Sequence, residues 1–456
     1  MSKLQAIILA GGKGNRLELV GNNSFDIWDE SERALLPVAG VPIFWYPLNV
    51  LAKNNITDVL LITNSACLNK IKKLLKDGTL PELPGLKIEI VAPPASTEEN
   101  EHIEFGSAEV LQMFADRIHQ DFLLLTGYFV SDISLDNMIK MHYEKESILT
   151  CLLSNTACNA AAPGPKDQQS YRDFVGICEK SNQLVYLQSE EELDPGISEL
   201  EIDLVNFSKA GNVEFSSAYA DCHVYLMDRR LLDLLGSFVS ETENFSGERN
   251  FSSIKVDLIP TLLDKQFKND PSLLSLFKRS NLQTLAYELQ NGTNAEVPSL
   301  FRILGYKATA DDASIVGKCN TLGAYLETNK SLLGLKKPFF SALAEPAKYP
   351  GTKVSIIKSH IDASSKIGDK EISVVKSSLG KNCTVSNNVK IEESIIMDGV
   401  TIGSGSQVKH CVVGRGAKIG ANCKLQNCVI ESEHVVDQKT NATDLFIQDD
   451  KEWDYE

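Results

Sequence analysis

A glycine-rich segment near the amino terminus carries the residue types that bind phosphate. It reads Leu9-Ala-Gly-Gly-Lys-Gly-Asn-Arg-Leu17 and directly follows an apolar run. Its glycines let the backbone approach a polyphosphate and offer it N–H groups, and Arg16 adds a planar set of donors. The spacing matches neither the G-x-G-x-x-G dinucleotide motif nor the G-x-x-x-x-G-K-S/T phosphate loop. We expect nucleotide binding here, and a tight turn that holds no ligand is the alternative.

A second position that bears on chemistry lies at the end of another apolar run. Phe122–Thr126 is followed by Gly127 and Tyr128. Tyr128 supplies no carboxylate, the kind of hard oxygen ligand that Mg²⁺ takes at about 2.1 Å. The next acid, Asp132, would lie about 13 Å further along an extended chain. The sequence therefore predicts no metal ligand at the end of this run.

The elements that must position these residues alternate between strand and helix patterns from residue 4 to about residue 330. Short β-branched runs predict strands at 6–9, 58–63, 87–91 and 122–126, and helix-period stretches predict helices at 44–53, 66–76 and 108–118. Such alternation is typical of βαβ units, whose mostly parallel strands form one sheet covered on both faces. We expect a Rossmann-like α/β domain over residues 1–330 and a linker over residues 331–353.

The period of the pattern changes after the linker. Aliphatic residues recur at every sixth position, each followed by small or polar residues, with five-residue steps in places, such as 408 to 413. A six-residue period does not match an α-helix, and the alternation of a hairpin array is absent. The pattern is typical of a left-handed parallel β-helix, in which each hexad makes one strand and one corner. We expect this coil over residues 354–438 and a solvated acidic tail over residues 439–456, with a docking segment as the alternative for the tail.

Composition narrows the function classes. The 456 residues include 61 acidic and 45 basic side chains, a formal charge of −16, which disfavours generic binding to nucleic acid or to a membrane surface. No apolar run approaches the ~18–20 residues of a membrane-spanning helix. The ten cysteines form no C-x-x-C pair, and the seven histidines lack the spacing of metal ligands. We therefore expect reduced thiols, a cytosolic location, and neither a metal nor a cofactor.

Taken together, these motifs resemble the nucleotidyltransferases that make nucleoside-diphosphate sugars. The resemblance rests on G-G-x-G-x-R-L, on A-L-L-P-V-x-G-x-P at 34–42, on the segment 105–109 in place of a G-T-A-G element, and on 253–260 in place of a late D-x-x-P segment. A hexapeptide coil behind that domain fits the same family. The resemblance covers nearly all of residues 1–438 and by itself implies a sugar-nucleotide pyrophosphorylase.

The chain departs from this family at the positions where the family's chemistry lies. By the resemblance, Tyr128 stands where a Gly-Asp aspartate holds Mg²⁺, and Arg33 stands where a lysine contacts the substrate phosphate. Guanidinium and ammonium groups are not equivalent at such a point. No D-I-G precedes the segment 325–329, where the stretch reads Lys318-Cys-Asn-Thr-Leu-Gly323. Because phosphoryl-type transfer depends on positioning and on metal electrostatics, we expect no catalytic residue and only a vestigial nucleotide site, formed by Gly11, Gly12, Gly14 and Arg16.

One branch of the family keeps the fold without the catalytic residues, namely the gamma and epsilon subunits of eukaryotic translation initiation factor 2B. The segments 42–51, 253–266 and 320–329 are similar to the gamma branch, and the end of the chain soon after its coil favours gamma over epsilon. The resemblance implies a non-catalytic scaffold or regulatory subunit of the guanine-nucleotide exchange factor for translation initiation factor 2. Its partners would be the epsilon subunit, the alpha, beta and delta regulatory subunits, and factor 2 itself.

Two other functions stay open. One is an active pyrophosphorylase, such as a mannose-1-phosphate guanylyltransferase, and the other is a regulatory sensor that binds a nucleotide without turnover.

The coil offers a candidate interface. Ile395 and Ile396 are neighbours, as are Val412 and Val413, so one side chain of each pair should point out of the coil. We expect Ile395, Ile396 and Val412 to mark a subunit interface, and Ile396→Asp to weaken binding of epsilon without unfolding the chain. The alternative is that these pairs only absorb the five-residue steps.

Overall fold

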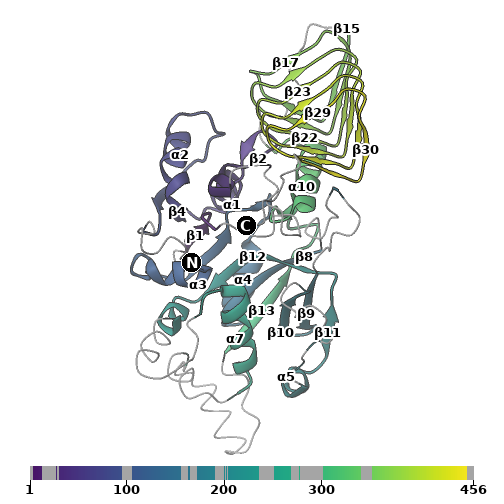
Figure 1. The fold of residues 1–456 in the computed structure, drawn as a ribbon. Coiled ribbons are helices and arrows are strands. Elements are labelled where there is room, and N and C mark those ends of the chain that lie inside the picture. The colour runs from purple at the N-terminus through teal and green to yellow at the C-terminus, as the bar shows by residue number, and fades with distance from the viewer. Residues whose placement is uncertain are drawn as a thin grey trace, which may run out of the picture.

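The computed structural model describes residues 4–12, 27, 30–94, 105–155, 163–164, 172–190, 200, 202, 204–235, 251–268, 277, 301–339 and 352–448. An α/β domain occupies the first part of the chain, and a triangular coil of short strands follows it (Figure 1). Most of the expected linker, and Trp453 and Tyr455 of the expected tail, lie outside the described residues.

The central sheet of the first domain has seven strands in the order β13-β8-β12-β6-β1-β4-β5. β1 is parallel to β4 and β6, β4 to β5, and β8 to β13, whereas β12 runs antiparallel to both of its neighbours. This mixed, mostly parallel sheet confirms the expected α/β class. Its strands are β1 (Gln5–Leu9), β4 (Asp58–Ile62), β5 (Lys87–Val91), β6 (Phe122–Thr126), β8 (Ser147–Ser154), β12 (Ala220–Met227) and β13 (Arg302–Lys307).

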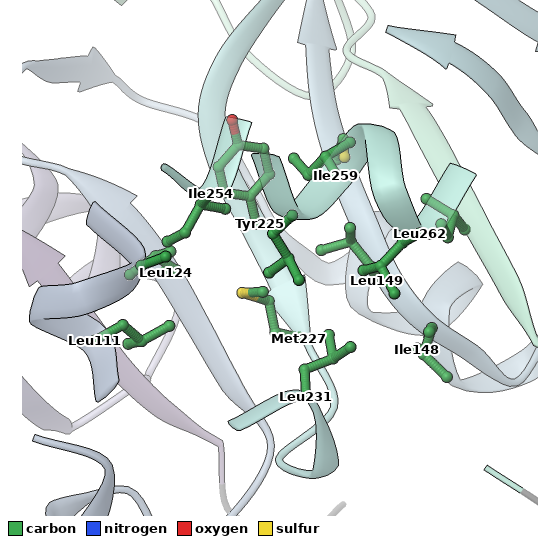
Figure 2. Close-up of a cluster of buried hydrophobic side chains, with 14 of the residues drawn as sticks. Leu111, Leu124, Ile148, Leu149, Tyr225, Met227, Leu231, Ile254, Ile259 and Leu262 are labelled. Carbon is green, nitrogen blue, oxygen red and sulfur yellow. The ribbon is translucent and has the colours of Figure 1, made fainter. Parts of the chain in front are cut away.

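Helices cover both faces of the central sheet, because its strands are apolar on both sides. One face packs against α1 (Trp45–Lys53), α2 (Ser65–Lys76) and α4 (Asp136–Glu144). The other packs against α3 (Ser107–Met113), the π-helix η6 (Ile254–Leu258) and α7 (Ile259–Lys265). Figure 2 shows this second layer, in which Ile254 and Ile259 lie near Tyr225 of the sheet. No helix of the described segments is long and apolar enough to span a bilayer.

Smaller elements lie around the central sheet. A three-stranded antiparallel sheet has the order β10-β9-β11, and β7 pairs with β14. The strand β2 pairs with β3 in a short hairpin. Their bounds are β2 (Pro37–Val38), β3 (Val41–Pro42), β7 (Phe129–Ser131), β9 (Asp173–Cys178), β10 (Leu184–Ser189), β11 (Val213–Ser216), β14 (Val316–Lys318), the 3₁₀ helices η2 (Glu30–Leu35) and η4 (Ala115–Arg117), α5 (Leu204–Ala210) and α10 (Leu322–Gly334).

The coil has three parallel sheets, which form the faces of a triangular prism. Face 1 contains β15 (Thr352–Ile357), β18 (Lys370–Val375), β21 (Lys390–Glu392), β24 (Gln407–Lys409), β27 (Lys424–Gln426) and β30 (Asn441–Thr443). Face 2 contains β16 (His360–Ile361), β19 (Ser378–Leu379), β22 (Ile395–Ile396), β25 (Val412–Val413), β28 (Val429–Ile430) and β31 (Phe446–Ile447). Face 3 contains β17 (Lys366–Ile367), β20 (Thr384–Val385), β23 (Thr401–Ile402), β26 (Lys418–Ile419) and β29 (Val435–Val436). The coil thus reaches Ile447, beyond residue 438.

The five-residue steps of the sequence pattern recur once in each of the later coils. The inward side chains of Ile402, Val408, Val413 and Ile419 are separated by six, five and six residues, so one coil takes 17 residues. The short step falls at the corner between faces 1 and 2. There the chain turns with positive φ at residues such as His410 (+53°). The steps are therefore a regular feature of this β-helix.

Face 2 of the coil packs against the α/β domain of the same chain. Ile395 and Val412 point out of the coil and join a buried cluster with Tyr46 of α1 and Tyr325 of α10, whereas Ile396 lies inside the coil. One member of each aliphatic pair does point outward, but the α/β domain covers it. Ile395, Ile396 and Val412 are all at most 2% exposed, so they form no free surface. The expectation that Ile396→Asp leaves the fold intact is wrong, because the carboxylate would be buried in an apolar interior.

Close polar and steric contacts complete this junction between the domains. A Cβ on Gly40 would lie 1.9 Å from Nε2 of His360, so only glycine fits between β2 and β3 at this point. Nζ of Lys358 donates to the carbonyl oxygen of Gly334, at 2.8 Å, at the end of α10. The junction therefore fixes how the two domains sit relative to each other.

Candidate functional site

The carboxyl ends of β1 and β6 form one edge, where the predicted phosphate loop and Tyr128 should meet. Leu9 is in register with Thr126, and the backbone N–H of Gly127 donates to the carbonyl oxygen of Leu9 at 2.7 Å. Loops at this edge of an open α/β sheet usually carry the ligand site. The parallel pairing of β1 with β6 thus brings the two predicted segments together.

The described part of the glycine loop is positioned by packing. A Cβ on Gly11 would lie 2.8 Å from the backbone nitrogen of Asn64, so the loop passes too close to the end of β4 for any other residue. Gly12 is exposed and has open space where its side chain would be. Gly14 and Arg16 lie outside the described residues. The phosphate-binding role of this loop stays a prediction.

Tyr128 closes the edge between the two loops. Its hydroxyl donates to the carbonyl oxygen of Gly12 at 3.1 Å. Burial raises the pKa of Tyr128 to about 12, although the positive charge of Arg33 acts to lower it. The phenol is therefore a neutral hydrogen-bond donor at physiological pH and uses its proton within the chain. Gly12, Arg33 and Tyr128, which were singled out from the sequence, lie in one neighbourhood.

Asp132, the next acid along the chain, has a structural role. Its Oδ1 accepts hydrogen bonds from the backbone N–H groups of Ser314 (2.8 Å) and Ile315 (3.0 Å). These bonds hold the chain that enters β14 beside the end of β7. Asp132 therefore orders the neighbouring loop through its carboxylate.

A cluster of buried charges near this edge was not found from the sequence. It consists of Asp173 on β9, Asp221 on β12, Lys255 on η6 and Lys318 on β14, each less than 10% exposed. Nζ of Lys255 donates to Oδ1 of Asp173 at 2.8 Å and to Oγ of Ser189 at 2.6 Å. Nζ of Lys318 donates to the backbone carbonyl oxygen of Asp221 at 2.7 Å. A clue was available, since each of these charges interrupts or borders an otherwise apolar strand or helix.

The two aspartates of the cluster respond differently to burial. Burial acts to raise the pKa of Asp173, but the charges of Lys255 and Lys318 outweigh it and hold this pKa well below its usual range. For Asp221 burial prevails over the same lysines, and its pKa is raised. Tyr225 donates its hydroxyl hydrogen to the Asp221 carboxylate. The cluster thus neutralises its own charge with side chains of this chain.

The pairing of β7 with β14 joins the cluster to the Tyr128 loop. Lys318 is in register with Phe129, and the backbone N–H of Cys319 donates to the carbonyl oxygen of Tyr128 at 3.0 Å. By the resemblance, position 128 is where the family carries a metal-binding acid, and position 318 begins the stretch in which the family carries D-I-G. The fold brings both positions together, and here they hold a phenol and an ammonium group.

These residues do not fit the magnesium ion that the resembled family uses. Mg²⁺ requires oxygen ligands with near-octahedral geometry. Tyr128 donates to Gly12, Asp132 accepts from backbone N–H groups, and Lys318 would repel a cation. Within the described segments no three or more His, Cys, Asp or Glu side chains are grouped as a metal would require. The arrangement can stabilise the edge of the sheet, but it offers no set of ligands for a divalent cation.

Two family models match the chain. One, described as nucleotidyl transferase, matches residues 5–161, and the other, described as the EIF2B subunit epsilon LbH domain, matches residues 351–442. Translation initiation factor eIF2B subunit gamma of Caenorhabditis elegans is 28% identical over 388 residues, which are 84% of this chain and 81% of that protein. The Schizosaccharomyces pombe protein of the same name is 24% identical over 73% of this chain and 66% of its own length. Glucose-1-phosphate thymidylyltransferase of Neisseria meningitidis is 40% identical over 76 residues, 17% of this chain and 24% of that enzyme.

The fold and these matches define a nucleotidyltransferase-like protein with a carboxyl-terminal left-handed β-helix of hexapeptide repeats. Within that class, the two gamma-subunit relatives confirm the resemblance to the gamma subunit of translation initiation factor 2B that the motifs first indicated.

Proposed function

We propose that this chain is a non-catalytic scaffold subunit of a guanine-nucleotide exchange complex of the translation initiation factor 2B type. It would pair with an epsilon-type subunit and join alpha, beta and delta subunits to act on translation initiation factor 2. The names of its relatives support membership of such a complex. We place the protein in the cytosol, and the nine described cysteines, which are buried thiols outside any disulfide, agree with a reducing compartment.

One observation carries the non-catalytic part of this proposal. At the edge where a working transferase needs acidic metal ligands, the hydroxyl of Tyr128 bonds to Gly12 and the ammonium of Lys318 bonds to Asp221. Phosphoryl-type transfer depends almost wholly on positioning and on stabilising charge at the phosphates. A neutral phenol with a pKa of about 12 cannot replace a carboxylate in that role. The fold around the site is retained, which suits a scaffold.

The physical role we propose is to hold partners in a fixed geometry. The apolar junction between face 2 and the α/β domain, whose buried cluster includes Val412, Tyr46 and Tyr325, ties the two domains together. Side chains in such a junction are close-packed and the junction deforms little, so the two domains keep one relative orientation. A rigid body of two domains can orient the epsilon-type subunit and factor 2 so that exchange occurs on the partner.

A comparison of exchange rates tests the proposal. Release of labelled GDP from factor 2 is measured with this chain alone, with the epsilon-type subunit alone, and with both. We expect no acceleration by this chain alone and a faster rate for the pair than for epsilon alone. Acceleration by this chain alone, or no difference between the pair and epsilon, would count against a scaffold role.

An active pyrophosphorylase is the second candidate function. The short segment that is 40% identical to a glucose-1-phosphate thymidylyltransferase favours it. A radiolabelled pyrophosphate exchange assay with Mg²⁺ and a panel of nucleoside-diphosphate sugars decides between the two, since only an enzyme gives labelled nucleoside triphosphate. A sensor without turnover would instead show nucleotide binding in calorimetry that Arg16→Ala abolishes.

A further inference from the structure

Charge is divided unevenly between the two parts of the chain. Residues 352–448 contain 12 lysines and arginines and 10 acids, a net charge of +2, although the whole chain carries −16. The rest of the chain therefore carries −18. The coil thus has a small excess of positive charge in an acidic protein, so the location of its lysines matters.

The excess lies on the two faces of the coil that the α/β domain does not cover. From β17 to β30, the strands of faces 1 and 3 carry six lysines and two glutamates. Both glutamates are already paired, Glu371 with Lys353 at 2.7 Å and Glu392 with Lys409 at 3.7 Å. The remaining five lysines are exposed and make no ion pair within the described residues; they are Lys366, Lys370, Lys390, Lys418 and Lys424.

Strand pairing arranges three of these lysines around one corner of the prism. Lys390, Gln407 and Lys424 are in register on face 1, so the two lysines are two coils, or about 10 Å, apart. Lys418 on face 3 precedes Lys424 by six residues in the same coil, across the corner between the faces. The result is a flat surface with ammonium groups at regular spacing and Thr and Gln side chains between them.

We propose that this lysine surface of faces 1 and 3 docks an acidic protein surface, presented by the epsilon-type subunit; the choice of partner rests on the proposed function. Unpaired cations on a flat sheet are matched by carboxylates at similar spacing, which raises the association rate and fixes register. Nucleic acid fits less well. The outward strand positions of the lysine surface carry no aromatic side chain on which bases could stack, and the chain's overall charge repels a polyanion at long range.

Charge reversal tests the proposal on the full-length chain. The variant Lys390→Glu/Lys418→Glu/Lys424→Glu changes three exposed side chains of the lysine surface. The control is Lys72→Glu/Lys73→Glu/Lys76→Glu on α2, which changes the net charge by the same amount at exposed positions of the α/β domain. Binding to immobilised epsilon-type subunit is measured between 50 and roughly 300 mM NaCl, because pairing of exposed charges weakens with salt. Circular dichroism checks that both variants are folded, and a Lys→Ser triple variant replaces the first if it is not.

We expect the dissociation constant of the unchanged chain to rise with salt. At low salt the lysine-surface variant should bind at least about tenfold more weakly than the unchanged chain. The α2 control should bind as the unchanged chain does. Equal binding by the two triple variants would overturn the proposed docking role of the lysine surface, but it would not contradict the proposed function. No binding by the unchanged chain would overturn both. Tight binding of a 20-base-pair RNA duplex that only the lysine-surface variant loses would assign the surface to nucleic acid and also overturn the proposal.

Discussion

The ammonium group of Lys318 lies 2.7 Å from the backbone carbonyl oxygen of Asp221, and both residues are buried beside the loop that carries Tyr128. A cation that belongs to the chain cannot dissociate, so its charge is present at this edge whether or not a ligand is bound. Nζ of Lys255 donates instead to the side-chain carboxylate of Asp173, at 2.8 Å. This edge of the nucleotidyltransferase-like fold is thus held together by the chain's own charged groups, from which the predictions below follow.

Lys255→Met should destabilise the α/β domain by about 3–5 kcal/mol, because it leaves the Asp173 carboxylate buried without its partner. Equilibrium unfolding in guanidinium chloride measures this. The exposed Lys72→Met serves as the control and should change little. The double variant Asp173→Asn/Lys255→Met should recover part of the loss, and a single variant as stable as the unchanged chain would show that the pair contributes little.

Tyr128→Asp should not create a pyrophosphorylase. It adds one carboxylate, but Lys318 still occupies the neighbouring position and repels a divalent cation. Pyrophosphate exchange with Mg²⁺ should stay at background, with an active pyrophosphorylase as the positive control. Measurable turnover by this single variant would show that Lys318 does not block the site.

Tyr128→Phe, which loses only the hydrogen bond to Gly12, should lower the free energy of unfolding by about 1 kcal/mol.

Val412→Asp should separate the two domains, because Val412 is fully buried between face 2 and the α/β domain. A charge placed there without a partner should cost about 3 kcal/mol or more. Val435→Asp is a matched control, since Val435 lies on a strand of the same coil but is 58% exposed. Hydrogen exchange across α10 should accelerate in the first variant alone, and equal exchange in both would mean that the junction is weaker than its packing indicates.

Stability should fall as the pH drops below about 6.5. Burial lowers the pKa of His360 from its ordinary 6.5, against the opposing charge of Asp362, and burial and Lys330 lower the pKa of His410. The unfolded chain therefore takes up these protons first, which favours unfolding at acidic pH and has no effect well above pH 6.5. Both histidines lie at the junction between the domains.

Chemical unfolding at pH 7.5, 6.5 and 5.5 measures this dependence. His360→Gln should make the dependence on pH shallower, whereas His119→Gln, at an exposed position outside the junction, should leave it unchanged. If stability depends on pH equally in the unchanged chain, in His360→Gln and in His119→Gln, then His360 is not the source of that dependence.

The sequence by itself determined the elements and their class. The strands at β1, β4, β5 and β6 and the hexads of the coil are visible because hydrophobic period is a local property, set by which side chains must face an interior. The absence of an acid at position 128 was visible for the same reason, because this position is identified as soon as the end of one strand is located.

Only the tertiary structure decided what those elements bury and what they leave free. Asp173 and Lys255 are 82 residues apart, and nothing local to either indicates the other. The sequence showed that one of Ile395 and Ile396 must face outward, but not that the α/β domain would cover it. Pairing of distant charges and packing of one domain on another are long-range contacts, whose partners are chosen by the whole fold. For that reason the aliphatic pairs of face 2 are covered, whereas the lysines of faces 1 and 3 are exposed.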